Sequence, residues 1–347
     1  MGTTSSNNIN TTRAAPIIQH ADREDKENIP PLPTARHLDT LLTSSRALLD
    51  ELCGIRILLP LNRYCPRCKA QHPEQRLTAH DDSKMSDGVR LRCNRCTGSW
   101  GVRHGSIFDY SDLPLRTLIR LIHSFWAGIT PTQAAATCGV DRKTASRWYG
   151  RLRQCTHEYM QRHPILFPAD EIVEVDECHL QCLQKRGATS DTAAAAAGES
   201  SSKAKGPKVW IIGCVGRDTK WVSLDVAPNH QTATIQPLID AHLPHSSTIL
   251  LADKDKSFLY LKKRHTFHQS EKRKTTHGNG LYVKTYYASG PGRHGRREFP
   301  VHTNTIEGYW ALFRERIGNQ DESMIDILLS ECMFRSLRIP ITPVLQV

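Results

Sequence analysis

The stretch Glu171-Ile-Val-Glu-Val-Asp-Glu-Cys-His179 predicts a β-strand, because apolar residues alternate with polar ones along it. Asp176 lies in the second half of this strand. A second stretch, Thr248-Ile-Leu-Leu-Ala-Asp253, is a short apolar run that predicts another strand and ends directly on an acid. These two aspartates can therefore lie close together if the two strands are neighbours in one sheet.

A third acid belongs to a helical pattern. Glu307 lies in His302-Thr-Asn-Thr-Ile-Glu-Gly-Tyr-Trp310, which predicts the start of a helix. Two aspartates at strand ends and a glutamate on a later helix can converge and bind two Mg²⁺ (or Mn²⁺) ions, since hard divalent cations prefer carboxylate oxygens. A pair of such ions stabilises the attacking and the leaving oxygen of a phosphodiester displacement. His302 and Asn304 are expected to contact the scissile phosphate or to orient Glu307.

Each acid also has an explanation that needs no metal. Asp176 can belong to the exposed face of a strand beside Glu174. Asp253 can cap the turn that leaves its strand. Glu307 lies three residues after Asn304, so it can be the N3 partner at a capped helix start.

The surrounding residues alternate between strand and helix patterns. Their order of three strands, a helix, a strand and a later helix fits a ribonuclease-H-like sheet, so the expected fold class is α/β. A low-complexity, alanine-rich insertion occupies 184–207. The predicted strands are 172–179, 208–215, 221–226 and 247–252, and the predicted helices are 232–243 and 304–317.

Bulk composition limits the kind of partner. The chain has 347 residues and a formal net charge of +11, which favours a polyanion such as nucleic acid or an anionic membrane face. No apolar stretch reaches the roughly 18 residues that a bilayer-spanning helix needs, and no secretory signal is recognisable. We therefore expect an intracellular protein without a membrane partner, whose eleven cysteines serve as metal ligands and buried thiols.

Four of the cysteines form two CxxC pairs. Cys65-Pro-Arg-Cys68 and Cys93-Asn-Arg-Cys96 have the spacing of a closed tetrahedral site for one structural Zn²⁺. The residues from Arg90 to Cys93 and from Ser99 to Val102 are predicted to be the two arms of a hairpin. The sequence therefore predicts a zinc ribbon, with four free thiols as the alternative.

A helix-turn-helix pattern follows the cysteines. Thr130 and Pro131 predict one helix start, Gly139 the turn, and Asp141 the cap of a second helix. Such a second helix can enter the major groove of DNA. An ordinary helical spacer with a solvated basic face is the alternative. The predicted DNA-binding residues are Arg142, Lys143, Ser146, Arg147 and Arg151.

The first 39 residues are polar and have no apolar period, so they are expected to be disordered. Within them, Lys26-Glu27-Asn28 resembles the KEN degron read by a cell-cycle ubiquitin ligase. This short motif also occurs by chance in tails of this composition.

Taken together, the motifs resemble the Merlin superfamily of transposases and their bacterial insertion-sequence relatives, over roughly Leu58 to Arg338. The third acidic stretch, His302 to Trp310, is the most specific match. The other segments that resemble the family are the two CxxC pairs with Gly105-Ser-Ile-Phe108, Val173-Glu-Val-Asp-Glu177, Val209-Trp-Ile-Ile-Gly213, Asp253 with Phe258 and Leu261, and Glu331-Cys-Met-Phe-Arg335.

The resemblance implies a DDE transposase that binds terminal inverted repeats and uses Asp176, Asp253 and Glu307 for strand cleavage and strand transfer. It implies double-stranded DNA as the partner, a homodimer or larger assembly, and a nuclear location if the source is eukaryotic, or otherwise the cytoplasm with its DNA. The expected division is a tail over 1–39, a zinc ribbon region over 40–108, a helix-turn-helix domain over 109–165 and a ribonuclease-H-like catalytic domain over 166–347.

The chain departs from the family after Asp253. Lys254 and Asp255 stand where the family has a small residue and a tryptophan, and Asp255 is an alternative ligand to Asp253. A transposase-derived DNA-binding protein that no longer cuts, and a general ribonuclease-H-like nuclease, are therefore competing hypotheses.

Overall fold

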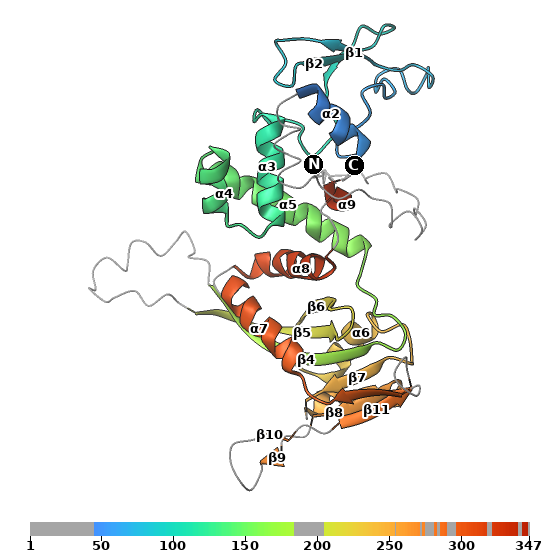
Figure 1. Cartoon of the computed structure of the whole chain (residues 1–347), viewed down its shortest axis with the longest axis vertical. Coiled ribbons are helices and arrows are strands. Elements are labelled where there is room, and N and C mark those ends of the chain that lie inside the picture. The colour runs from blue at the N-terminus through green and yellow to red at the C-terminus, as the bar shows by residue number, and fades with distance from the viewer. Residues whose placement is uncertain are drawn as a thin grey trace, which may run out of the picture.

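The computed structural model describes residues 45–183, 205–253, 255–270, 273–274, 281–282, 285–289, 296–317, 321–338 and 342–345. The predicted tail, its Lys26-Glu27-Asn28 motif and most of the 184–207 insertion lie outside these residues. The described chain is elongated, with a small β-unit at one end, helices in the middle and a five-stranded sheet at the other end (Figure 1). No helix among the described residues is long and apolar enough to cross a membrane.

The small β-unit contains the four paired cysteines. Its strands β1 (Thr78–Asp81), β2 (Val89–Arg92) and β3 (Ser99–Gly101) form an antiparallel sheet in that order. β2 and β3 pair as the two arms predicted from the sequence. Helix α2 (Ser45–Gly54) lies beside this sheet and buries its leucines in the same core.

Three helices follow: α3 (Leu115–Trp126), α4 (Pro131–Cys138) and α5 (Arg142–Arg162). The Thr130 side chain and the N3 side chain of α4 form a reciprocal capping box. Gly139 ends α4 with a φ of 67°, a conformation that costs glycine little, and Asp141 caps α5. Local sequence thus determines both helix ends and the turn between them.

The five-stranded sheet has the order β6-β5-β4-β7-β8. The strands β4, β5 and β6 are antiparallel to one another, whereas β7 and β8 run parallel to β4. This mixed α/β arrangement is consistent with a ribonuclease-H-like sheet. The strands are β4 (Ile172–Leu183), β5 (Lys205–Gly216), β6 (Val222–Ala227), β7 (Ile249–Ala252) and β8 (Thr266–Gln269).

The sheet differs from the prediction in two ways. The fifth strand, β8, was not predicted, because four partly polar residues give no apolar run. Strand β5 begins at Lys205 rather than 208, so the last residues of the predicted insertion belong to the sheet, where they extend the hairpin with β4.

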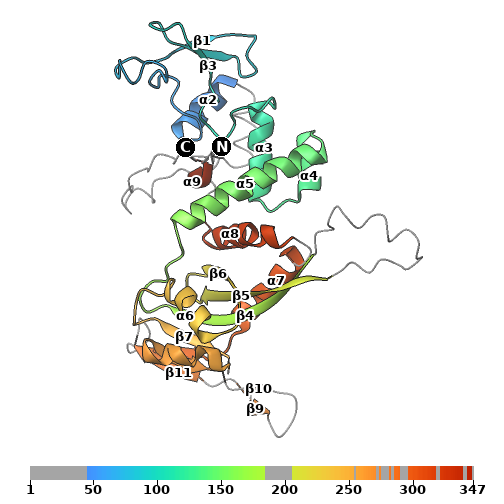
Figure 2. The ribbon, with the colours of Figure 1, turned by 180° about the vertical axis from the view of Figure 1, so that it is seen from behind.

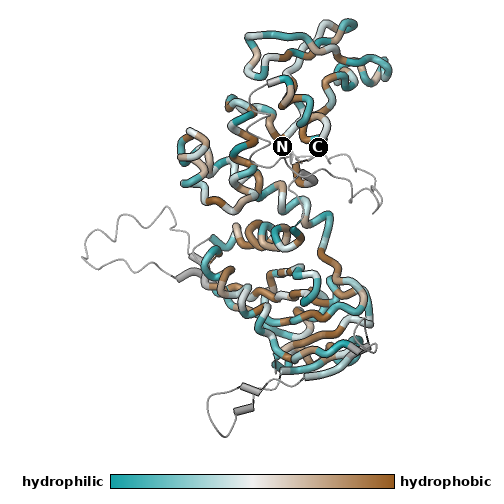
Figure 3. The backbone as a smooth tube through the Cα atoms, viewed as in Figure 1, coloured by the Kyte–Doolittle hydropathy of each residue, from teal (hydrophilic) through white to brown (hydrophobic). Residues whose placement is uncertain are grey.

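Helices cover both faces of the sheet (Figures 1 and 2). Helices α7 (Asn304–Ile317) and α8 (Ile325–Ser336) pack on one face, and α6 (Thr232–Asp240) with the 3-10 helix η3 (Lys256–Lys263) packs on the other. Hydrophobic residues concentrate in the strands and in the helix surfaces that face them (Figure 3). The remaining short elements are β9 (Arg273–Lys274), β10 (Leu281–Tyr282), β11 (Thr285–Ser289), β12 (Arg296–Pro300), η5 (Glu322–Met324) and α9 (Thr342–Leu345).

Helix α8 joins the central helices to the sheet. It contacts β6 on one side and α5 on the other. The Arg335 guanidinium donates to the carbonyls of Phe125 and Trp126 at the end of α3, at 2.7 and 2.9 Å. Arg335 also pairs with Glu331 at 2.8 Å, and the other oxygen of Glu331 accepts from Arg153 of α5 at 2.7 Å. Glu331 of α8 therefore binds Arg153 of α5 and also holds Arg335, which connects α8 to the end of α3.

This junction gives a stability prediction. Replacing Arg335→Ala should lower the free energy of unfolding by about 2–4 kcal/mol, because two carbonyls and the largely buried Glu331 lose a charged partner. Urea denaturation followed by circular dichroism measures the change. Arg316→Ala, on the exposed side of α7, is the matched control and should stay within about 0.5 kcal/mol of wild type. Equal effects of the two substitutions would contradict the assignment.

Candidate active site

Asp176 and Asp253 lie beside each other where β7 ends. Asp253 directly follows β7, as predicted, whereas Asp176 is an internal residue of β4, because β4 continues to Leu183 in its hairpin with β5. The β4–β7 ladder ends with Val175 opposite Ala252, and the two aspartates are the next residues along each strand. Both side chains are half-buried. Carboxylate oxygens of Asp176, Glu177 and Asp253 lie within 4.8 Å of one another. The parallel register thus brings together two acids that are distant in sequence.

Glu307 approaches this pair from α7. It lies in the first turn of the helix, is exposed, and accepts a hydrogen bond from Thr303 Oγ1 at 3.1 Å. Burial raises the pKa of Asp176, and the charges of Asp253 and Glu307 add to this effect, so the three acids share one electrostatic environment. The compact group within 4.8 Å contains Glu177 rather than Glu307.

The start of α7 is held by Glu174, which is two residues before Asp176 on β4 and has no exposed surface. Its Oε2 accepts from the backbone N–H groups of Thr305 and Ile306, at 2.8 and 3.1 Å, and its Oε1 accepts from Thr305 Oγ1 at 2.8 Å. A helix N-terminus exposes unpaired N–H groups that favour a negative charge. Glu174, rather than Glu307, therefore satisfies the first donors of α7.

Arg217 completes the anchor. It donates to Glu174 Oε1 at 2.7 Å, to Pro300 O at 2.6 Å, and to His302 O and His302 Nδ1 at 3.0 Å each. The backbone N–H of Asn304 also points at His302 Nδ1, at 3.3 Å. Both groups around Nδ1 are donors, so this nitrogen is an acceptor and the neutral ring carries its proton on Nε2. Burial and the Arg217 charge lower the pKa of His302, which agrees with a neutral ring.

The two residues predicted as auxiliary therefore differ in environment. His302 belongs to the anchor that orients α7. Asn304 is the first residue of α7 and its side chain is exposed. No described contact ties the Asn304 side chain to the three acids.

Trp310 positions Asp176 from the next turn of α7. Its Nε1–H donates to Asp176 Oδ2 at 2.9 Å, and its ring is 3 % exposed. The ring lies against Gly213, the residue opposite Asp176 on β5. A Cβ added at Gly213 would lie 2.6 Å from the Trp310 ring, so only glycine leaves room for it.

Asp255 has a different place from Asp253. Its side chain caps η3 by accepting from Ser257 N at 2.7 Å, and its own N–H donates to Asp253 Oδ1 at 2.9 Å. It belongs to a second group, with Glu177 and His230, whose ligand atoms also lie within 4.8 Å of one another. Asp253 is thus the acid beside Asp176, and Asp255 lies on the side of His230.

Asp176 and Glu177 both have raised pKa values, so their ionised forms are unfavourable unless a positive charge lies nearby. Burial raises the pKa of Asp176 to about 6, and the charges of Asp253 and Glu307 add to this effect. Burial and the charge of Asp176 raise the pKa of Glu177 to about 7. Glu177 Oε2 is buried and has no hydrogen-bond partner. An all-oxygen group of crowded carboxylates is the donor set that Mg²⁺ or Mn²⁺ prefers.

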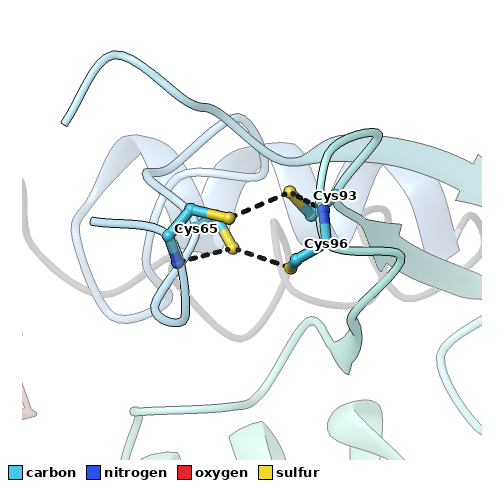
Figure 4. A group of neighbouring side chains, drawn as sticks. Cys65, Cys93 and Cys96 are labelled. Atoms are coloured by element: carbon cyan, nitrogen blue, oxygen red, sulfur yellow. Dashed lines mark hydrogen bonds between the residues drawn. The ribbon is translucent and has the colours of Figure 1, made fainter. Parts of the chain in front are cut away.

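The four paired cysteines face one another at the end of the β-unit (Figure 4). The Sγ atoms of Cys65 and Cys96 are 3.6 Å apart, and those of Cys68 and Cys93 are 3.8 Å apart. Four thiolates bound to one tetrahedral Zn²⁺ at about 2.3 Å lie about 3.8 Å from one another. The backbone N–H of Cys96 lowers the pKa of Cys93, whereas burial raises the pKa of Cys65 and of Cys68, so one thiol of the four is favoured as the thiolate before a metal binds. The geometry and chemistry therefore fit zinc.

The basic residues in the first turns of α5 are exposed. Ala145, Trp148 and Leu152 bury the opposite face of the helix. The Arg151 guanidinium lies over the Trp148 ring, 4.8 Å from its centroid. All five residues predicted to bind DNA have exposed side chains on α5: Arg142, Lys143, Ser146, Arg147 and Arg151.

Sequence reasoning missed the residues that support the acids. Gly213 inside an apolar strand was the clearest available signal, because such a glycine often marks a close approach. Glu174 was considered only as the neighbour of Asp176. Arg217 and His230 lie in loops with no pattern of their own, and their partners are 43 and 53 residues away.

No protein-family model and no curated protein matches the sequence. The solved structures that are similar in part include two of Mos1 transposase. The paired-end complex with the left transposon end has a TM-score of 0.18 and 15% identity over 39% of this chain and 51% of that chain, so the chain spans about half of that protein. The pre-cleavage Mos1 transpososome has a TM-score of 0.20 and 12% identity over 66% and 78%. The Merlin resemblance stays a prediction.

The raised pKa of Asp176 gives a testable pH dependence. The folded protein holds this proton up to about pH 6, whereas the unfolded chain releases it near 3.8, so stability falls as the pH rises through 6. Without divalent ions, Asp176→Asn should be more stable than wild type at pH 8, by on the order of 1–3 kcal/mol, and equal to it below pH 4.

Urea titrations across pH measure this difference, and added Mg²⁺ should reduce it. Asp326→Asn, an exposed position on α8, is the control. If the wild type instead becomes more stable than Asp176→Asn as the pH rises, the ionised Asp176 carboxylate stabilises the fold and the prediction is wrong.

Proposed function

We propose that the chain is a DDE transposase that binds the terminal inverted repeats of a DNA element and catalyses metal-dependent strand cleavage and strand transfer. The observation that carries this proposal is that Asp176, inside β4, lies beside Asp253, which directly follows the parallel strand β7, with Glu307 on a helix that β4 also anchors. The Merlin-type motifs of the sequence support the same assignment.

In this proposal Asp176, Asp253 and Glu307 hold two Mg²⁺ (or Mn²⁺) ions. Such ions lower the pKa of a bound water and stabilise the leaving oxygen of a phosphodiester. The residues of the chain position the carboxylates. Trp310 orients Asp176 by its indole N–H, the Asp255 backbone N–H orients Asp253, and the Thr303 hydroxyl orients Glu307.

Both reactions of a transposase are in-line displacements at phosphorus, so one set of acids serves both. In the first, water attacks the phosphodiester at the element end and a 3′-hydroxyl leaves. In the second, that 3′-hydroxyl attacks a phosphodiester of target DNA and a target 3′-oxygen leaves. Neither reaction needs a nucleophilic side chain, and no covalent protein–DNA intermediate is part of the proposal.

Recognition of double-stranded DNA is proposed for the exposed face of α5, assisted by the cysteine unit. The Arg and Lys side chains of this face and the net charge of +11 suit contacts to phosphates. Binding should weaken steeply with salt, as expected when counterions are released from DNA. Because a transposase processes two element ends, we expect a dimer or larger assembly. A nuclear location and a ubiquitin-ligase contact through Lys26-Glu27-Asn28 remain predictions.

The decisive experiment is strand cleavage and joining on duplexes taken from the repeats that flank the coding sequence. With Mg²⁺ or Mn²⁺, the wild-type protein should cut these duplexes at the element 3′ end and join them to target DNA. Glu307→Gln should lower the rate by about 100-fold or more, because a metal-binding carboxylate is lost. Glu315→Gln, the same change on the exposed side of α7, should leave the rate unchanged.

Two outcomes would overturn this proposal. Tight binding to the repeats without cleavage by any variant would indicate a transposase-derived DNA-binding protein. Cleavage with no preference for the repeats would indicate a general nuclease.

The cysteine unit gives a separate prediction. Purified protein should contain one tightly bound Zn²⁺ per chain, and Cys96→Ser should lose it, because a three-thiolate site binds zinc less tightly. Elemental analysis after dialysis against a weak chelator measures the zinc content. Cys138→Ser, a half-buried thiol at the end of α4, is the control and should keep the zinc. Equal zinc in Cys96→Ser and wild type would refute the assignment.

A further inference from the structure

A second cluster of ligand atoms lies on the opposite side of β4 from α7. Successive side chains of a strand point to opposite faces. Asp176 accordingly meets Trp310 of α7, whereas Glu177 meets His230, in the loop between β6 and α6. Asp255 completes this cluster, and its three ligand atoms lie within 4.8 Å of one another.

Glu177 is incompletely satisfied. Its Oε1 accepts from His230 Nε2 at 2.9 Å, but its Oε2 is buried and has no partner. The Glu177 side chain is 13% exposed, and burying an unpaired carboxylate oxygen is costly. Asp255 Oδ2 lies 4.0 Å from His230 Nε2, too far for a hydrogen bond. A cation between these groups would satisfy both carboxylates.

The three groups are held before any ion binds. The His230 ring stacks on the Trp210 indole of β5, with centroids 4.6 Å apart and an interplanar angle of 23°. Asp255 is fixed by its cap of η3, and Glu177 by the β4–β5 ladder. Asp255 is 35% exposed, so the cluster is open to solvent on that side. Ligands on separate, supported elements are what a metal site requires.

The donor set differs from that of the three proposed catalytic acids. One imidazole nitrogen with two carboxylates suits borderline transition metals such as Zn²⁺, Mn²⁺ or Co²⁺, whereas an all-oxygen set suits Mg²⁺. The His230 proton now shared with Glu177 is the one that a metal at Nε2 would replace.

We propose that Glu177, His230 and Asp255 bind one divalent transition-metal ion, at a site that adjoins the group of Asp176 and Asp253 and shares Glu177 with it. The ion ties the β6–α6 loop to β4 and to the start of η3. Because the Asp255 N–H donates to Asp253 Oδ1, the same ion fixes the orientation of Asp253. The proposal concerns metal binding alone and stands whether or not the chain cuts DNA.

Cobalt is the probe that separates the sites. Full-length protein is first saturated with Zn²⁺ at the cysteines, dialysed, and then titrated with Co²⁺ by calorimetry and visible absorption. Co²⁺ on thiolates gives an intense charge-transfer band, whereas Co²⁺ on nitrogen and oxygen ligands gives weak visible bands alone. We expect a Co²⁺ class of the second kind.

Substitutions test whether these Co²⁺ ions bind to Glu177, His230 and Asp255. His230→Ala and Asp255→Asn should each weaken this binding by about 10-fold or more. Asp255→Asn keeps an oxygen that can cap η3, which guards against a simple folding defect. His179→Ala is the matched control, since His179 also contacts the Trp210 ring, at 3.6 Å between centroids, but lies outside the cluster. Glu307→Gln should leave this Co²⁺ class intact.

Thermal unfolding gives a second readout. Co²⁺ should raise the midpoint of wild type and His179→Ala by mass action, and raise that of His230→Ala less. The proposal is overturned if folded His230→Ala and Asp255→Asn bind Co²⁺ as tightly as wild type. It is also overturned if Glu307→Gln alone abolishes the class, which would assign the ion to the three catalytic acids.

Discussion

The buried carboxylate of Glu174 is the interaction on which the candidate site depends. It sits on the central strand, without solvent, and is compensated by a guanidinium, a hydroxyl and two backbone N–H groups. Removing one partner of such a buried group leaves the other charge uncompensated, which is far costlier than losing a surface pair. Glu174 therefore fixes where α7 begins, and with it the position of Glu307 and Trp310 relative to Asp176.

The parts of the structure that were predictable from the sequence are those with a local signature. The CxxC pairs, the capped helices around Gly139 and the apolar residues that precede each aspartate rest on residues within a few positions of one another. The β4–β7 register then places Asp176, inside β4, beside Asp253, which directly follows β7. Strand β8 had no such signature, since its stability comes from the neighbouring β7 ladder rather than from its own residues.

The supporting residues were not predictable for the same physical reason. Trp310 and Asp176 are 134 residues apart, and Arg335 and Phe125 are 210 apart. Pairs at such separations are chosen by tertiary packing, which no local pattern encodes. Asp253 and Asp255 show how far local sequence can predict the site, because both are acids near the end of β7 and the sequence does not distinguish them. Only the ladder, which stops at Ala252, and the η3 cap separate their roles.

Helix α8 has a consequence for how the two halves of the molecule work together. Its contacts with α5, with the end of α3 and with β6 leave little freedom between the basic face of α5 and the acids of the sheet. Under the proposed function, the distance between the DNA-binding face and the catalytic acids is therefore fixed. The number of base pairs between the recognised sequence and the reacting phosphate is then a property of the fold, and element ends of different sequence would share one fixed offset.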